Sequence, residues 1–177
     1  MGIITIGKKK FQTKEKEMNQ QELFFYIDNP RVYSALRANG NMNPSQQEIE
    51  TLMRKTENVK ELKVQIEQNG GLIEPLIVVS RNDNYIVLEG NSRLAAYRIL
   101  AENNPAKWSK VSVQILPEEI TEAEIFTLIG TYHLVKKKDW TVYEQAAYVY
   151  RQKQLLGCPM STLAKQVGLS VPTVKKY

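Results

Sequence analysis

A glycine and an arginine three residues apart mark the place in this sequence best suited to hold an anion. Segment 88–96 reads LEGNSRLAA, in which an apolar strand pattern ends at Gly90 and a helical pattern follows. The first backbone N–H groups of a helix have no helical partner, and the helix dipole favours negative charge there. Gly90 would let a phosphate approach the backbone, and Arg93 could grip it with two parallel hydrogen bonds. The spacing predicts an anion site; a plain strand-to-helix turn with Arg93 in a surface ion pair is the alternative.

A second constellation lies at the C-terminal end, where segment 161–177 reads STLAKQVGLSVPTVKKY. Two short helices that cross steeply need a small residue at the crossing and a glycine in the turn, and Ala164 and Gly168 meet these needs. The pattern predicts a helix-turn-helix, with a helical hairpin used only for packing as the alternative. The residues expected to cap the second helix or to face DNA are Ser170, Thr173, Lys175, Lys176 and Tyr177.

The distribution of charge agrees with a DNA-binding end. Residues 136–177 hold eight Lys or Arg and two Asp or Glu, a net charge of +6. Residues 1–135 hold sixteen Lys or Arg and seventeen Asp or Glu, a net charge of −1. This is the footprint of a surface that faces a polyanion. One cysteine cannot form an internal disulfide, and no apolar run approaches the ~20 residues that span a bilayer. We therefore expect a cytoplasmic protein with no membrane partner.

The elements that position these residues follow from hydrophobic periodicity. Residues 1–22 are rich in lysine after a short apolar start and indicate a flexible basic arm. Strands are expected at 23–27, 76–80, 85–89 and 111–116. Helices are expected at 32–38, 43–54, 57–69, 93–103, 122–129 and 141–156, followed by two short ones. The first part of the chain thus contains both strands and helices, and the last part contains only helices. This order predicts an α+β fold of two domains, 23–135 and 136–177.

In these motifs the sequence resembles the ParB/sulfiredoxin-like superfamily, specifically the ParB-type partition proteins, from about residue 23 to residue 177. The matching parts are Asn29-Pro30-Arg31, the helix end at 67–70 (EQNG), segment 73–79 (IEPLIVV), the turn at 90–93 (GNSR) and the helix-turn-helix. The resemblance implies a small mixed-sheet domain that binds a nucleoside triphosphate, CTP in chromosomal members, followed by an all-helical domain that binds double-stranded DNA.

The resemblance also implies which residues hold the nucleotide. By match to the family motifs they are Glu74, Pro75, Gly90, Asn91, Ser92, Arg93, His133 and Lys136. Tyr132 stands where a later family motif, Glu-Asn-x-x-Arg, supplies a magnesium-binding carboxylate. No metal ligand is therefore predicted, and magnesium use, hydrolysis and the preference for cytidine stay open.

Three functions fit these features. The first is a nucleotide-gated DNA-binding protein in the partition or regulation of a chromosome, plasmid or mobile element. The second is a nucleotide-dependent enzyme of the same fold, a kinase or nuclease, and the third is a transcription factor that has lost nucleotide binding. An enzyme needs a base near Arg93, and only Glu74 and Glu89 are close in sequence, so catalytic residues stay unassigned and we expect at most weak nucleoside triphosphatase activity. Family members dimerise through a C-terminal segment, which the end at Tyr177 would omit, so a fragment of a homodimeric protein is expected.

Overall fold

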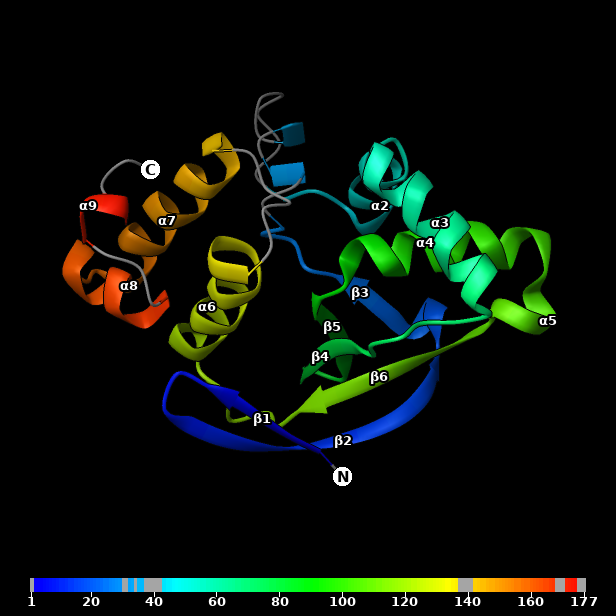
Figure 1. Ribbon diagram of the computed structural model, residues 1–177, viewed down its shortest axis with the longest axis horizontal. Helices are drawn as coiled ribbons and strands as arrows, with labels where there is room; N and C mark the ends of the chain where they lie inside the picture. The colour runs from blue at the N-terminus through cyan, green and yellow to red at the C-terminus, as the bar shows by residue number, and fades with distance from the viewer. Residues whose placement is uncertain are drawn as a thin grey trace.

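The structure of the protein is a computed structural model that describes residues 2–29, 32–33, 35–36, 43–136, 142–167 and 171–174, without the side chains of 134–136, 142–145, 166–167 and 173. Six strands form one mixed sheet in the order β1-β2-β6-β4-β5-β3 (Figure 1). The strands are β1 (Gly2–Ile6), β2 (Lys9–Asn19), β3 (Leu23–Phe25), β4 (Leu76–Arg81), β5 (Asn84–Glu89) and β6 (Lys110–Leu116). β3 and β5 are parallel, as are β4 and β6, and the remaining neighbours are antiparallel.

Two groups of helices flank the sheet (Figure 1). The first group consists of α2 (Gln46–Arg54), α3 (Glu57–Asn69), α4 (Asn91–Asn103) and α5 (Pro105–Trp108). The second consists of α6 (Glu122–Gly130), the π-helical turn η2 (Thr131–Lys136), α7 (Val142–Leu156), α8 (Met160–Val167) and α9 (Val171–Val174). A short 3₁₀ turn, η1 (Gln20–Glu22), leads into β3.

The continuous apolar run of β4 is explained by this arrangement, because both of its faces are buried. Leu76 and Val78 belong to the hydrophobic cluster under α2–α5, whereas Ile77 and Val79 belong to the cluster under α6–α9. Successive side chains of a strand point to opposite faces, so a strand covered on both sides has no polar alternation. The mixed α+β fold expected for the first part of the chain is confirmed.

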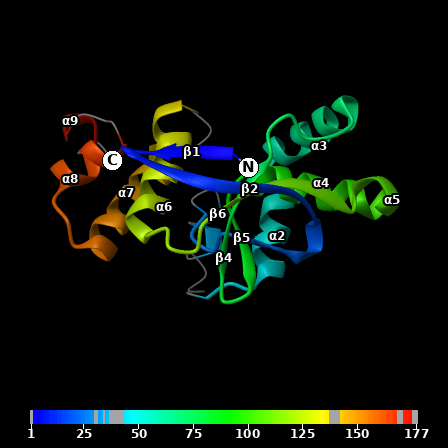
Figure 2. The ribbon, with the colours of Figure 1, turned by 90° about the horizontal axis from the view of Figure 1, so that it is seen from below.

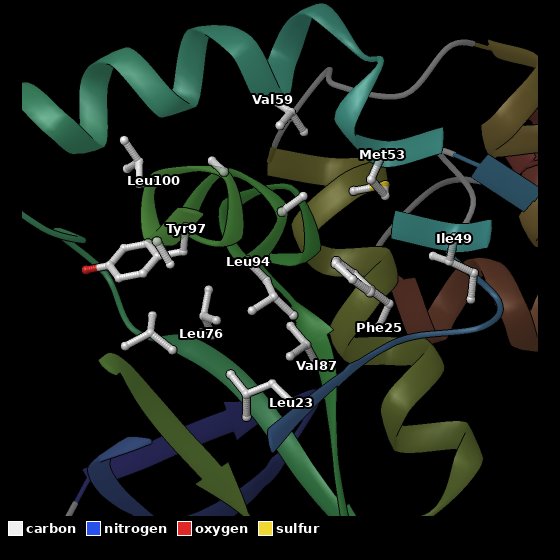
Figure 3. Close-up of a cluster of buried hydrophobic side chains, with 14 of the residues drawn as sticks. Leu23, Phe25, Ile49, Met53, Val59, Leu76, Val87, Leu94, Tyr97 and Leu100 are labelled. Atoms are coloured by element: carbon white, nitrogen blue, oxygen red, sulfur yellow. The ribbon is translucent and has the colours of Figure 1, made fainter. Parts of the chain in front are cut away.

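The cluster under α2–α5 fixes the position of α4, the helix that follows the predicted anion turn. Figure 3 shows Leu94, Tyr97 and Leu100 of α4 between the sheet residues Leu23, Leu76 and Val87 and the helix residues Ile49, Met53 and Val59. Most of these side chains are completely buried. These buried contacts hold α4 against the sheet and thereby fix the position of its first turn.

Apart from the helix expected at 32–38, the expected strands and helices between residues 23 and 156 are confirmed, with ends shifted by three residues or fewer. Ser45 caps α2 with a reciprocal capping box with Glu48, as its place before the helix indicates. The helix expected at 32–38 falls partly outside the described residues. The domain division at residues 135 and 136 stays a prediction.

The flexible arm predicted for residues 1–22 is wrong over the described residues. β1 and β2 form an antiparallel hairpin, and residues 14–19 of β2 also pair with β6. Ile6 is buried in the cluster under α6–α9, and β1 contacts α6, toward which the hairpin reaches in Figure 2. Ile4 and Ile6 pack on this tertiary surface, whereas Ile3, on the other side of β1, is exposed. The surface that stabilises the strand is formed by residues far away in sequence.

An arginine of α7 joins the helical end of the chain to the loop after β3. Arg151 donates from Nη1 to Asp28 Oδ1 and from Nη2 to the Asp28 backbone oxygen, both at 2.9 Å. Its guanidinium carbon also lies 3.7 Å from the ring centroid of Tyr33.

Among the described residues, no helix is long and apolar enough to cross a membrane.

We expect Arg151→Ala to lower the free energy of unfolding by about 2 kcal/mol, because the half-buried Asp28 loses the two hydrogen bonds that the guanidinium donates to it. Urea unfolding followed by circular dichroism measures this change. Lys153→Ala, an exposed position on the same helix, serves as the control and should change the value by less than about 0.5 kcal/mol. Equal effects of the two variants would contradict the prediction.

Candidate functional site

The turn between β5 and α4 has the geometry that its sequence predicts. Gly90 has φ +98°, in the left-handed region that favours glycine. A Cβ atom there would lie 2.5 Å from Leu76 Cδ2 and 3.0 Å from Arg93 Nη2, so a side chain does not fit. The N–H of Leu94 donates to the Gly90 oxygen at 2.9 Å and is the first helical hydrogen bond. The N–H groups before it therefore have no partner within the helix.

Arg93 lies over this turn in a buried ion pair. Its Nη2 donates to Oε2 of Glu89, the last residue of β5, and its Nη1 donates to the Glu74 backbone oxygen at 2.6 Å. The side chain of Arg93 is 14% exposed and that of Glu89 is 5% exposed. An ion pair of Arg93 was the alternative to an anion site at this turn. The structure has such a pair, but it is largely buried and does not lie on the surface. It occupies the place where an anion would bind.

The side chain of Asn91 has a structural task. Its Oδ1 accepts from the Tyr26 N–H at 3.0 Å, and its Nδ2 donates to the Val87 oxygen at 2.8 Å. The amide thereby joins the start of α4 to the chain after β3 and to β5. Its backbone N–H, like that of the half-buried Ser92, belongs to the first turn of the helix. These N–H groups, more than the Asn91 side chain, are what the turn offers a ligand.

Tyr132, which follows Arg93 by 39 positions in the chain, belongs to the surroundings of the ion pair. Burial, and then the negative charges of Glu89 and Glu74, raise the pKa of the Tyr132 phenol above its ordinary value, while Arg93 opposes the shift. Tyr132 lies in η2, so this turn places the phenol within the electrostatic influence of the three charged groups. His133, its neighbour in η2, is half-buried, and the side chain of Lys136 lies outside the described residues.

A cavity of about 240 Å³ opens beside Arg93, between α3 and the loop that enters β4. Its walls include Leu62, Gln65, Asn69, Leu72, Ile73 and Glu74; the half-buried Pro75 follows at the start of β4. Ligand sites for drug-sized molecules measure roughly 300–1,000 Å³, so this cavity has room for one ring system. The sequence analysis assigned no residue of α3 to the site. The signal that could have found them is the spacing of Gln65 and Asn69, which are four positions apart and therefore share one face of that helix.

Comparison with known proteins agrees with these features. The family model of the ParB N-terminal domain matches residues 37–125, which include α2 to β6 and the Gly90 turn. The chain belongs to the ParB N-terminal domain family. The hairpin of β1 and β2 lies outside the matched residues. A comparison with curated proteins gave no match.

Solved structures of ParB proteins share this fold. The C-terminally truncated chromosome-partitioning protein ParB from Caulobacter crescentus, complexed to the centromeric parS site, is 18% identical, with a TM-score of 0.51 over 90% of this chain and 68% of that chain. The Pnob8-like ParB-N domain is 14% identical, with a TM-score of 0.53 over 89% of this chain and 51% of that one. The Caulobacter protein complexed with CTP-γ-S is 16% identical, covers 91% of this chain and 74% of that chain, and has a TM-score of 0.44.

The predicted DNA-contacting residues of this ParB-family chain lie mostly beyond the described ones. Ser170, Lys175, Lys176 and Tyr177 are outside them, and Thr173 lies in α9 without a described side chain. α8 and α9 contact each other, and Leu163, Ala164 and Val174 are buried. This packing is what two crossing helices need, and the helix-turn-helix itself stays a prediction. Within the described part of the chain, no three His, Cys, Asp or Glu residues are grouped so that they could hold a metal ion.

Proposed function

We propose that this protein binds a nucleoside triphosphate at the start of α4 and double-stranded DNA through its C-terminal helices, as a cytoplasmic protein of DNA partition. The Gly90 turn carries the proposal for the nucleotide. It lies within the residues that match the ParB N-terminal domain, it leaves the first N–H groups of α4 without a partner in the helix, and it holds one arginine above them. Phosphates bind well at such helix starts.

The proposal assigns a place to each part of the ligand. The phosphates would lie against the N–H groups of Asn91 and Ser92 and against Arg93. The base or ribose would lie in the cavity beside α3, where Glu74 and Pro75 form the edge. His133 and Lys136 would approach the phosphates from η2. Cytidine is the first base to test, because the resemblance to ParB-type proteins implies it.

Calorimetric titration of the full chain with each of the four ribonucleoside triphosphates, with and without duplex DNA, tests this proposal. We expect at least one triphosphate to bind, and we expect the corresponding nucleoside alone to bind far more weakly, because the phosphates make the contacts at the turn. Absence of binding by all four would leave a ParB-fold protein without nucleotide binding.

The DNA part of the proposal rests on the net charge of +6 in residues 136–177. Binding to duplex DNA should weaken steeply with salt, and Lys175→Ala with Lys176→Ala should flatten the plot of log K against log salt by up to about 2 units. Fluorescence anisotropy at several salt concentrations measures this. Lys55→Ala with Lys60→Ala removes two exposed lysines around α2 and α3 and should leave the slope unchanged. Binding that does not depend on salt would contradict the proposal.

An enzyme of the same fold is the second candidate, and the carboxylate of Glu89 beside Arg93 favours it. We nevertheless expect slow or no hydrolysis of the triphosphate. Phosphoryl transfer depends on neutralising charge on the phosphate oxygens, which magnesium on a protein carboxylate commonly does, and Tyr132 stands at the family's carboxylate position. A phosphate-release assay with magnesium, DNA and each triphosphate decides this. Rapid turnover that is lost in Glu89→Gln or Glu74→Gln would establish the enzyme.

A further inference from the structure

We infer that Glu89 is an internal competitor for the ligand: its carboxylate holds Arg93, and a phosphate must take the arginine from it. This inference rests on the proposed function, since it concerns the same turn. It adds a cause for selectivity: the competition makes the site favour ligands with many negative charges, such as triphosphates, over those with few.

The first observation is the position of the guanidinium. Atoms Nη2 and Nε of Arg93 lie 3.0 Å and 3.2 Å from the point that a Cβ atom of Gly90 would occupy. The head group of Arg93 therefore folds back over the turn, above the backbone that a phosphate would approach. The contact with Glu89, four residues earlier, holds it there. A phosphate cannot reach the turn without moving the arginine or sharing it with Glu89.

The second observation is the balance of charge. Arg93 donates to the carboxylate of Glu89 and to the backbone oxygen of Glu74, a residue whose side chain is exposed, and the negative charges of both glutamates act on Tyr132. A guanidinium has five N–H donors, so it could hold a carboxylate and a phosphate together. These two anions would then repel each other over a short distance in a partly buried site, where such repulsion is strong.

Displacement has a cost as well. If Arg93 turns to the phosphate, the buried carboxylate of Glu89 loses the charged hydrogen bond from Arg93, which is unfavourable in an interior. The ligand must offset this loss by its attraction to Arg93 and to the start of α4, and that attraction grows with the number of charged phosphate groups. Pyrophosphate and single phosphates should therefore open the pair less readily than tripolyphosphate does.

Glu89→Gln tests the inference, because it removes the charge and keeps the shape and a hydrogen-bond acceptor for Arg93. The probes are inorganic tripolyphosphate and pyrophosphate, titrated into the full chain by calorimetry. We expect Glu89→Gln to bind tripolyphosphate at least about tenfold more tightly than the original chain, and to discriminate less between the two probes. Glu67→Gln makes the same chemical change at an exposed position of α3 and should alter the affinity by less than about twofold.

Each outcome has a separate meaning. If the original chain binds tripolyphosphate and Glu89→Gln binds it equally or less tightly, Glu89 is no competitor and the inference fails alone. If neither chain binds tripolyphosphate or any nucleoside triphosphate, the proposed function fails. Binding by Glu89→Gln alone supports both. Should Glu89→Gln not fold, Glu89→Asp, whose carboxylate is one methylene further from Arg93, should bind tripolyphosphate several-fold more tightly, and unchanged affinity would overturn the inference.

Discussion

Arg93→Ala is expected to lower the free energy of unfolding by about 3 kcal/mol, because it removes the guanidinium that donates a charged hydrogen bond to the buried carboxylate of Glu89. It is also expected to abolish triphosphate binding, because it removes the guanidinium that lies directly over the Gly90 turn. Urea unfolding followed by circular dichroism measures the stability, and calorimetric titration measures the binding. From the sequence alone, with Arg93 in the first turn of a helix, a change in binding without a change in stability would have been expected.

The double variant Arg93→Ala with Glu89→Gln separates the two effects. Removing the charge of Glu89 as well should restore most of the lost stability, whereas binding should stay lost. A single Arg93→Ala variant that unfolds like the original chain would show that the ion pair contributes no net stability. A variant that still binds triphosphate normally would place the ligand away from the turn.

Gly90→Ala is expected to lower the free energy of unfolding by about 3 kcal/mol, since it adds a strained backbone conformation to a steric clash. The Cβ atom would meet Leu76 Cδ2 at 2.5 Å, and Leu76 is completely buried, so it has little room to move. Thermal and urea unfolding measure the loss.

Gly70 offers a matched control for this prediction. It ends α3 with φ +75°, also in the left-handed region, but a Cβ atom there would meet nothing within 4 Å. Gly70→Ala should therefore cost only the conformational strain, about 1 kcal/mol. The difference between the two variants measures the close approach of the turn to β4. Equal losses would show that Leu76 moves aside without cost and that strain alone selects glycine at position 90.

The local features of this protein could be predicted from its sequence. The buried run 76–79, the helix stop at Gly70 and the glycine turn before α4 depend on a few neighbouring residues and on the periodicity of strands and helices. The structure accordingly has these elements within a few residues of the expected ends. The anion site that we propose at the turn also rests on local sequence, because the order strand, glycine, helix and arginine is what predicts it.

Tertiary structure alone decided what surrounds the turn. The inward fold of Arg93 onto Glu89, the approach of Tyr132 from η2 and the cavity beside α3 all join residues that the sequence keeps apart or gives no reason to pair. The hairpin of β1 and β2 is the clearest case, since the same lysine-rich segment would suit a loose arm if no sheet edge and no α6 were there to receive it. Periodicity reports which side of an element is apolar, whereas only the packed chain determines what that side, or a charge beside it, will meet.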